Sequence, residues 1–282
     1  MKAFKYLSPT TVEEAITLHG QHSETAKYIA GGTDVIVRVK EGWLEPDYLI
    51  SLKKIEDLSE LHKNDATGEL SIGALVTHAT LEKSLMIQNE YPIIYDAVSN
   101  IGSLQVRNVG TIGGNLINAV PSADGAIPLI ALDGMALLHG PDGERSVAVK
   151  DLFIEPYKTI FPPQAPHTGS AYIKFGRRAA MELPLIGIGV LLTLNDDLEI
   201  CTKARICLGV AAPTPMRAFD AENLLVGKKI DEKILIEAGK IAADESKVRD
   251  SVRGKAWHRK EMIRVHVRRM GLKCMEIIKN NN

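Results

Sequence analysis

Two paired-glycine segments are the parts of this chain whose residue types and spacing best suit ligand chemistry. Residues 30–34 read Ala-Gly-Gly-Thr-Asp, and residues 111–115 read Thr-Ile-Gly-Gly-Asn. Glycine has no Cβ, so it leaves the backbone N–H uncovered and permits positive φ, and a phosphate can approach the main chain closely. Each pair follows a stretch with strand character and precedes an apolar run. The sequence therefore predicts two loops that close on one pyrophosphate.

The bulk composition is that of an ordinary globular protein. The 282 residues suffice for one large or two modest domains, with 45% hydrophobic and 24% charged residues. A net charge of −1 creates no global field that would attract nucleic acid or an anionic membrane. No apolar run approaches the roughly 20 residues of a membrane span, and residues 1–9 lack the apolar core of a secretory signal. We expect a cytoplasmic protein with no membrane span and no nucleic-acid partner.

The cysteines and histidines predict no metal centre in this chain. Cys201, Cys207 and Cys274 are odd in number and widely spaced, without a C-x-x-C motif. We expect buried thiols rather than a disulfide framework or an iron–sulfur site. The eight histidines are scattered without metal-ligand spacing, and no catalytic dyad is evident. The prediction therefore contains no metal ligand and no catalytic side chain.

Periodicity and capping signals predict strands that alternate with helices. Thr11 with Glu14 matches a capping box for a helix after a short extended segment at 4–7. Further strands are expected at 27–30, 48–52, 69–75, 171–175 and 198–210, with a buried apolar segment at 185–194. Further helices are expected at 35–39, 77–85, 93–98, 232–243 and 257–278, and 125–138 reads as a buried helix passing into a strand. This alternation indicates α/β or α+β architecture. Four prolines within 156–168 predict a linker or surface loop there, at the domain boundary.

Five ordered motifs resemble the FAD-binding medium subunit of the molybdenum hydroxylases. They are IAGGTD at 29–34, IGA at 72–74, RNVGTIGGNL at 107–116, PSAD at 121–124 and YIKFGRR at 172–178. The likeness runs from about Phe4 to about Ile278, in the same order and at similar spacing. The family contains bacterial xanthine, carbon monoxide and nicotinate dehydrogenases and aromatic acyl-CoA reductases.

The resemblance implies a fold of the α+β class. A two-subdomain FAD-binding fold of the vanillyl-alcohol-oxidase (PCMH) type is followed by a C-terminal domain with a small antiparallel sheet and helices. We expect the FAD-binding domain at 1–160, with subdomains at about 1–55 and 56–160. The C-terminal domain is expected at 170–280.

The resemblance also implies which residues contact FAD. Backbone N–H groups of both glycine segments would bind the pyrophosphate, with Thr33, Thr111 and Asn115 adding polar side-chain contacts. The full predicted set is Lys27, Ile29, Ala30, Gly31, Gly32, Thr33, Asp34, Val35, Ile101, Thr111, Gly113, Gly114, Asn115, Ile117, Asp124 and Lys174.

Several of these residues have an equally plain structural role. Asp34 beside a phosphate would repel it, so we expect its carboxylate to accept backbone N–H groups or to cap the next helix. Asp124 either accepts from the ribose side of FAD or caps a helix. Lys174 either stabilises the reduced flavin or is a solvated strand lysine. Core packing explains the apolar members equally well, and His78 could come near the cofactor.

The implied function is that of the flavin subunit of a heteromeric molybdenum hydroxylase. Substrate would be oxidised at a molybdopterin site on a large partner chain. Electrons would pass from two [2Fe–2S] clusters on a small partner chain through FAD to NAD⁺ or another acceptor, and a dimer of heterotrimers is compatible with this. Two alternatives stay open: a free-standing flavin oxidoreductase of the same fold, and a flavin-less assembly or scaffold protein. The intact glycine pairs argue against the second.

Two features add to this interpretation. Relatives carry a longer segment where residues 160–168 are short and proline-rich, so the surroundings of the flavin ring should differ here. From Lys247 to Lys279 there are eleven Lys or Arg residues against three carboxylates. Such a run is either a solvated face or a docking surface for an acidic partner subunit.

Overall fold

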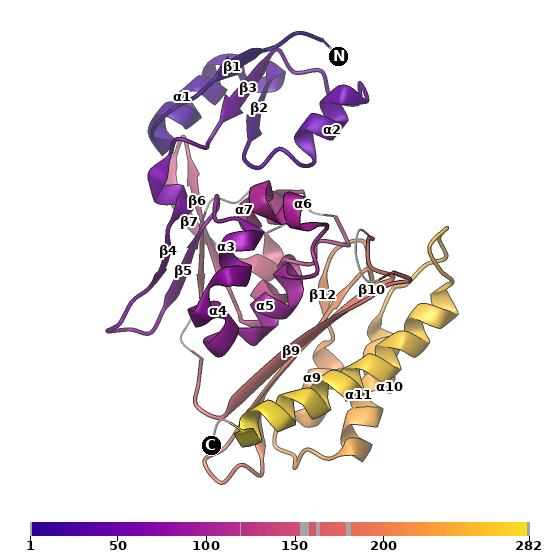
Figure 1. Ribbon diagram of the computed structural model, residues 1–282. Coiled ribbons are helices and arrows are strands. Elements are labelled where there is room, and N and C mark those ends of the chain that lie inside the picture. Colours follow the sequence, from indigo (N-terminus) through magenta and orange to yellow (C-terminus); the bar gives the residue numbers. More distant parts are fainter. Residues whose placement is uncertain (1, 119, 153–157, 162–163, 179–181, 281–282) are drawn as a thin grey trace.

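The computed structural model describes residues 2–118, 120–152, 158–161, 164–178 and 182–280, arranged around three sheets (Figure 1). The first sheet is parallel with strand order β1-β3-β2, the second has five antiparallel strands, and the third has four. Helices lie beside each sheet. The α+β architecture predicted from the sequence, with two subdomains followed by a sheet-and-helix part, is confirmed.

The N-terminal subdomain is a parallel sheet with helix α1 packed against it. Its elements are β1 (Lys5–Leu7), α1 (Val12–His22), the 3₁₀ turn η1 (Ser23–Thr25), β2 (Ala26–Ile29), α2 (Val35–Lys40) and β3 (Tyr48–Ser51). The predicted cap of α1 is present, since the Thr11 hydroxyl accepts from the N–H of Glu14 at 3.1 Å. β2 ends directly before the first glycine segment, so this segment lies at the carboxyl end of a parallel strand.

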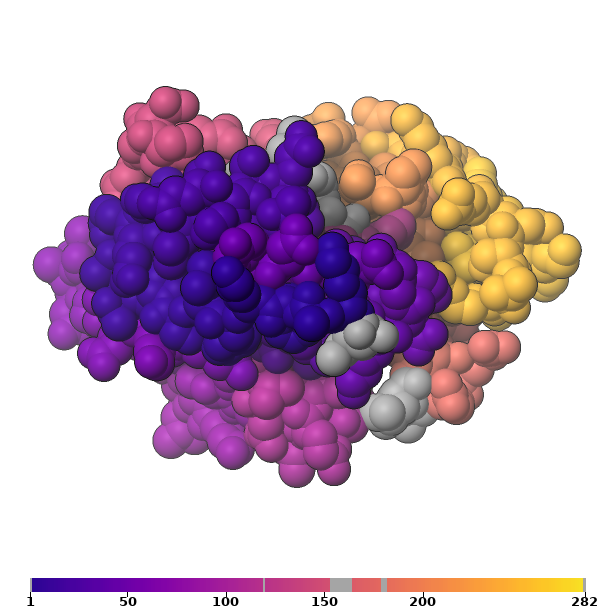
Figure 2. All heavy atoms as spheres, turned by 90° about the horizontal axis from the view of Figure 1, so that it is seen from above, coloured from indigo at the N-terminus to yellow at the C-terminus, as the bar shows by residue number. Residues whose placement is uncertain are grey.

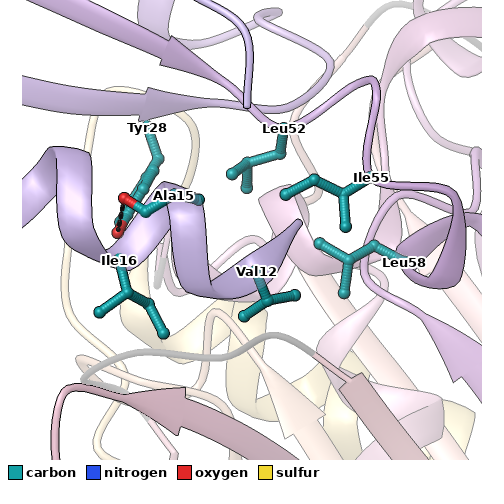
Figure 3. Close-up of a pocket in the computed structure, with 7 residues that line it drawn as sticks. All are labelled: Val12, Ala15, Ile16, Tyr28, Leu52, Ile55 and Leu58. Atoms are coloured by element: carbon teal, nitrogen blue, oxygen red, sulfur yellow. Dashed lines mark hydrogen bonds between the residues drawn. The ribbon is translucent and has the colours of Figure 1, made fainter. Parts of the chain in front are cut away.

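A narrow apolar hollow lies between α1 and this sheet (Figure 3). It is lined by Val12, Ala15, Ile16, Tyr28, Leu52, Ile55 and Leu58. The Tyr28 hydroxyl donates to the carbonyl oxygen of Ala15 at 3.2 Å and closes one side. The hollow leaves no space for a water molecule, so it is a packing feature of this core.

The second subdomain is an antiparallel sheet in the order β4-β5-β8-β6-β7, with short helices beside it. The strands are β4 (Leu61–Lys63), β5 (Leu70–Gly73), β6 (Met135–Gly140), β7 (Gly143–Ala148) and β8 (Lys158–Phe161). The helices are α3 (His78–Lys83), α4 (Leu85–Glu90), α5 (Pro92–Val98), α6 (Leu104–Val109), α7 (Ile112–Ile117) and α8 (Ala126–Ala131), with 3₁₀ turns η2 (Glu56–Ser59) and η3 (Val149–Asp151).

Two expectations for this subdomain are wrong. Residues 158–161, predicted as part of a linker, form β8 between β5 and β6; Pro156, Pro162 and Pro163 lie outside the described residues. The residues before the second glycine pair were expected to be extended, but they form helix α6. The Ser103 hydroxyl caps α6 by accepting from the N–H of Val106 at 3.3 Å, which starts a helical turn where the apolar pattern suggested a strand.

The C-terminal part is a four-stranded antiparallel sheet between two helical layers. Its elements are β9 (Thr168–Phe175), β10 (Ile186–Leu194), β11 (Cys201–Gly209), β12 (Met216–Arg217), α9 (Phe219–Leu225), α10 (Glu232–Glu245) and α11 (Ala256–Asn280). All residues of β10 are buried, because α5 and α8 pack on one face of the sheet and α9 and α11 on the other, with α10 packed against these two helices. Within the described part of the chain, no helix combines the length and apolarity needed to cross a bilayer.

Three glycines of this sheet allow α8 to approach it closely. A Cβ at Gly187, Gly189 or Gly209 would lie 2.8, 2.9 or 2.4 Å from side-chain atoms of Ile127. Ile127 therefore rests on bare backbone, and this contact fixes the position of Asp124, three residues earlier in the chain. The sheet and the second subdomain thus share one packed core.

Candidate cofactor site

The first glycine segment leaves a row of backbone donors free. The N–H groups from Gly31 to Asp34 find no acceptor among the described residues, although the carbonyl of Gly32 accepts from the N–H of Ile36 at 3.0 Å. Gly32 has φ of +80°, a conformation that side chains other than glycine rarely adopt. The turn between β2 and α2 therefore presents several main-chain donors at the carboxyl end of a parallel strand, the usual place for ligands in such sheets.

The second glycine segment is organised differently from the first. Thr111 is the N-cap of α7, and Gly113 and Gly114 lie in the first turn of that helix. The N–H of Gly113 donates to the carbonyl of Ala74 at 3.0 Å, and the N–H of Gly114 donates to the Thr111 hydroxyl at 3.1 Å. The N–H of Asn115 donates to the carbonyl of Thr111 at 3.0 Å. The expectation of bare amides at these three positions is therefore wrong.

The two glycines of α7 serve close packing, each in its own way. A Cβ at Gly113 would lie 2.7 Å from the Cβ and the carbonyl oxygen of Ala74, so this glycine brings α7 against the end of β5. A Cβ at Gly114 would meet only the Thr111 hydroxyl, at 3.0 Å. The remaining space at Gly114 is open, which leaves room for a ligand at the helix start.

The first glycine segment contacts residues on either side of the second, far away in sequence. A Cβ at Gly31 would lie 2.0 Å from the carbonyl oxygen of Val109, at the end of α6. On the same side, the Asn118 amide donates to Asp34 at 2.8 Å and accepts from Arg38 at 2.8 Å. Asp34 therefore bonds a side chain near α7 and makes no side-chain cap of α2, contrary to expectation.

Asp124 and Lys174 form a direct pair in the interior. The Lys174 ammonium lies 2.8 Å from one oxygen of Asp124, and the Tyr172 hydroxyl donates to the other at 2.6 Å. Lys174 also donates to the carbonyl of Asn100 at 3.0 Å. Burial raises the pKa of the Asp124 carboxyl, and the Lys174 charge and the hydrogen bonds from Lys174 and Tyr172 act against this shift. Lys174 is therefore not a solvated strand lysine, and Asp124 does not cap α8, whose N-cap is Gly125.

The Asp124 pair is joined to α7 through Asn115. The side-chain Oδ1 of Asn115 accepts from the N–H of Gly125 at 3.0 Å, and a Cβ at Gly125 would lie 2.6 Å from that oxygen. Asn115 faces the Asp124 segment and Asn118, three residues on, faces Asp34. Helix α7 thus connects both halves of the predicted site.

The other predicted residues lie around this framework. Ile29 is buried, and its Cδ1 lies 3.1 Å from the position that a Cβ at Gly32 would take. Ile101 is also buried, next to Asn100, whose carbonyl binds Lys174. Ile117 is 49% exposed. Ala30 and Val35 are half-buried and Lys27 is exposed.

Sequence reasoning missed several residues that complete this arrangement. Arg38 and Asn118 hold Asp34, and Tyr172 holds Asp124. Asn118 could have been suspected, because it follows Asn115 at helical spacing. The Tyr172 contact joins residues far apart in sequence, and no local signal reports it.

No candidate residue lines either of two hollows found in the described surface. One is the hollow of Figure 3, and the other, of about 250 Å³, lies between η3 and β12. Cys201, Cys207 and Cys274 are buried. The described residues contain no group of His, Cys, Asp or Glu that could hold a metal ion. The candidate site is therefore the polar framework around α7.

Fold and site together define a class of flavoprotein, in which an FAD-binding part is followed by a smaller sheet-and-helix domain. Residues 2–165 match the family described as the FAD binding domain in molybdopterin dehydrogenase, and residues 170–274 match the CO dehydrogenase flavoprotein C-terminal domain. The chain belongs to this family of FAD-binding oxidoreductase subunits, as its motifs suggested.

Relatives and solved structures agree with this assignment. The chain is 31% identical to the 6-hydroxypseudooxynicotine dehydrogenase complex subunit alpha of Paenarthrobacter nicotinovorans, over 97% of this chain and 95% of that protein. It is 33% identical to the nicotinate dehydrogenase FAD-subunit of Eubacterium barkeri, over 80% and 81%. A structure of carbon monoxide dehydrogenase from Hydrogenophaga pseudoflava superimposes with a TM-score of 0.91 at 28% identity, covering 97% of this chain and 98% of that one.

Proposed function

We propose that this chain holds FAD against the 30–34 turn and helix α7, as the flavin subunit of a multi-subunit molybdenum hydroxylase. The free N–H groups from Gly31 to Asp34 carry this proposal. A diphosphate needs several donors at close range, and a turn of uncovered amides supplies them without a lysine cluster.

The remaining contacts divide between the two sides of α7. The open space at Gly114 would let the cofactor pass close to the helix start, where the Thr111 hydroxyl and the Asn115 amide can still donate. Ile117 would cover apolar surface of the cofactor. The Asp124–Lys174 pair would orient polar groups of the cofactor that lie further from the diphosphate. In this division, loop 30–34 supplies backbone donors. Helix α7 supplies side-chain donors and lets the cofactor come close to its backbone at Gly114.

Bound FAD would supply two-electron redox chemistry between iron–sulfur clusters of a partner chain and an acceptor such as NAD⁺. The curated relatives carry names of complex subunits, including an FAD-subunit and an alpha subunit. We extend this to a small iron–sulfur partner and a large molybdenum partner, in a cytoplasmic assembly that could dimerise. No side chain of this protein needs to act as nucleophile or general acid in this role.

Purification from the native host tests the proposal. A flavin spectrum together with iron–sulfur absorbance and two copurifying chains is the expected result. A lone chain with full oxidoreductase activity would instead favour a free-standing flavoenzyme. Colourless protein that takes up no added FAD would contradict the proposal outright.

A further inference from the structure

The segment between α10 and α11, residues 247–257, is an ordered and strongly basic projection at one end of the C-terminal part (Figure 1). Figure 2 shows the C-terminal elements, in yellow, at one edge of the molecule. We propose that this segment docks onto an acidic surface of a partner subunit. The inference rests on the proposed function, because it requires a multi-subunit complex.

A tight turn at the centre of the segment displays an apolar tip. The N–H of Ser251 donates to the carbonyl of Gly254 at 3.0 Å, and the N–H of Gly254 donates back to Ser251 at 3.1 Å. Between them, Val252 is fully exposed, at 100%. Trp257, at the start of α11, is 71% exposed. A valine held wholly in water adds no free energy of apolar burial to the stability of the isolated chain.

Polar contacts hold the turn in place. Arg259 is 3% exposed and donates to the Ser251 hydroxyl at 2.7 Å. The Asp250 carboxylate accepts from the N–H of Ala256 at 2.8 Å and from Lys255 at 3.0 Å. The one carboxylate within the segment is thus already occupied by the segment itself.

The arginines of this region lack counter-charges. Among the described residues, Arg249, Arg253 and Arg259 form no ion pair within 4.0 Å. One terminal nitrogen of Arg253 and the Nε of Arg259 are buried without a hydrogen-bond partner. Burial, together with the charges of Arg253 and Arg249, lowers the pKa of Arg259. Cations that repel one another at the surface are stabilised when carboxylates are brought beside them.

The charge and the exposed apolar side chains of this segment indicate the kind of partner that it would bind. Lys247 and Arg249 are exposed in the same segment as Val252. A basic surface with exposed apolar side chains fits a protein partner that offers carboxylates around an apolar recess. Four basic residues further along α11 already form ion pairs, with Asp244, Glu261, Glu232 and Asp96, so the docking surface is confined to this segment.

The test uses the purified complex with its partner chains. A zero-length carbodiimide crosslinker, which joins lysines to carboxylates in direct contact, should link Lys247 or Lys255 to Asp or Glu residues of a partner subunit. Val252→Asp and Arg253→Glu should each lower the amount of this chain recovered in the complex at least about tenfold, since both place a carboxylate against an acidic surface. FAD content and melting temperature should stay at the wild-type values for Val252→Asp, because Val252 contacts only solvent.

The matched control for Arg253→Glu is Lys233→Glu, an equal charge change at an exposed position of α10. It should leave complex recovery unchanged. If Arg253→Glu alters folding, Val252→Asp decides. A complex that forms normally with Val252→Asp, or crosslinks that join this segment only to a second copy of this chain, would overturn the docking inference while leaving the flavin-subunit proposal intact. A wild-type chain that purifies with FAD but without partners would overturn both.

Discussion

Gly31 lies so close to Val109 that a methyl group on the glycine would come within 2.0 Å of the valine carbonyl oxygen. Gly31 lies in the turn after β2 of the N-terminal subdomain, and Val109 ends helix α6 of the second subdomain. The two subdomains therefore meet through backbone atoms, beside the amides that we assign to the diphosphate of FAD. Stability and cofactor binding should be separable at Gly31 and Gly114, because a Cβ at Gly31 would meet backbone, whereas a Cβ at Gly114 would meet only the Thr111 hydroxyl.

Gly31→Ala should destabilise the folded protein whether or not FAD is present. The added methyl group meets a backbone carbonyl that cannot rotate away, so the subdomains must separate locally, at an expected cost of about 1–3 kcal/mol. For a chain of this size that corresponds to a drop of several degrees, about 2–4 °C per kcal/mol. Thermal unfolding of the FAD-free chain measures it. An unchanged melting temperature would contradict the close contact.

Gly114→Ala should have the opposite profile. Alanine favours a helix over glycine by about 1 kcal/mol, and the new methyl group meets only the Thr111 hydroxyl, at 3.0 Å. The FAD-free chain should therefore melt at the wild-type temperature or slightly above it. FAD affinity should fall about tenfold or more, because the methyl group fills the space we assign to the cofactor. A fluorescence titration with FAD measures this, with Gly20→Ala, whose Cβ would meet nothing within 4 Å, as the control.

Asn118→Ala should weaken FAD binding by changing the shape of the 30–34 turn. The Asn118 amide is the bridge between Asp34 and Arg38, so its loss frees both side chains and lets the turn sample other conformations. We expect a several-fold loss of affinity, consistent with about 1 kcal/mol for the hydrogen bonds involved. Isothermal titration with FAD gives the value. Equal affinity of variant and wild type would show that the turn is held without this bridge.

The sequence predicted the elements where the signal was local. The hydroxyl of Thr11 accepts from the N–H of Glu14, as the capping pattern indicated. The motif order also placed the glycine segments and Asp124 in one neighbourhood. Each of these inferences depended on residues within a few positions of each other or on a resemblance that covers the whole chain.

What the sequence could not predict depends on partners distant along the chain. Residues 158–161 carry linker-like composition but become β8 because β5 and β6 lie on either side of it. The amides of Gly113 and Gly114 seemed free from the motif, yet Ala74 and the Thr111 hydroxyl accept from them. Glycine spacing indicates which amides have no side chain of their own over them. It cannot indicate whether a ligand or another part of the protein accepts a hydrogen bond from those amides.

Lys174→Met should be more destabilising than the double change Asp124→Asn with Lys174→Met. The single variant leaves a buried carboxylate with only the Tyr172 hydroxyl as partner, and breaking a buried pair in this way costs about 3–5 kcal/mol. The double variant removes the uncompensated charge and should recover a substantial part of that loss. Chemical denaturation of the four proteins of this cycle measures the coupling. Simple additivity of the two single changes would show that the pair is not coupled.

His78 should make folding stability depend on pH in a mildly acidic window. The imidazole is 2% exposed, its Nδ1 has no partner, and burial lowers its pKa from 6.5 to about 4, with a smaller contribution from Arg107. The unfolded chain therefore binds this proton first as the pH falls. Stability from the neutral imidazole is fully present above pH 6.5 and is lost progressively toward pH 4, by at most about 3 kcal/mol.

His78→Phe should remove this dependence because phenylalanine keeps the buried ring and cannot be protonated. Urea unfolding between pH 7 and pH 4 should then show a smaller decline for the variant than for the wild type, and His62→Phe, at an exposed position, should follow the wild-type curve. Because His78 packs against Gly110, next to the Thr111 cap of α7, the wild type should also release FAD more readily at the acidic end of this range. Parallel curves for wild type and His78→Phe would place the pH dependence in other groups.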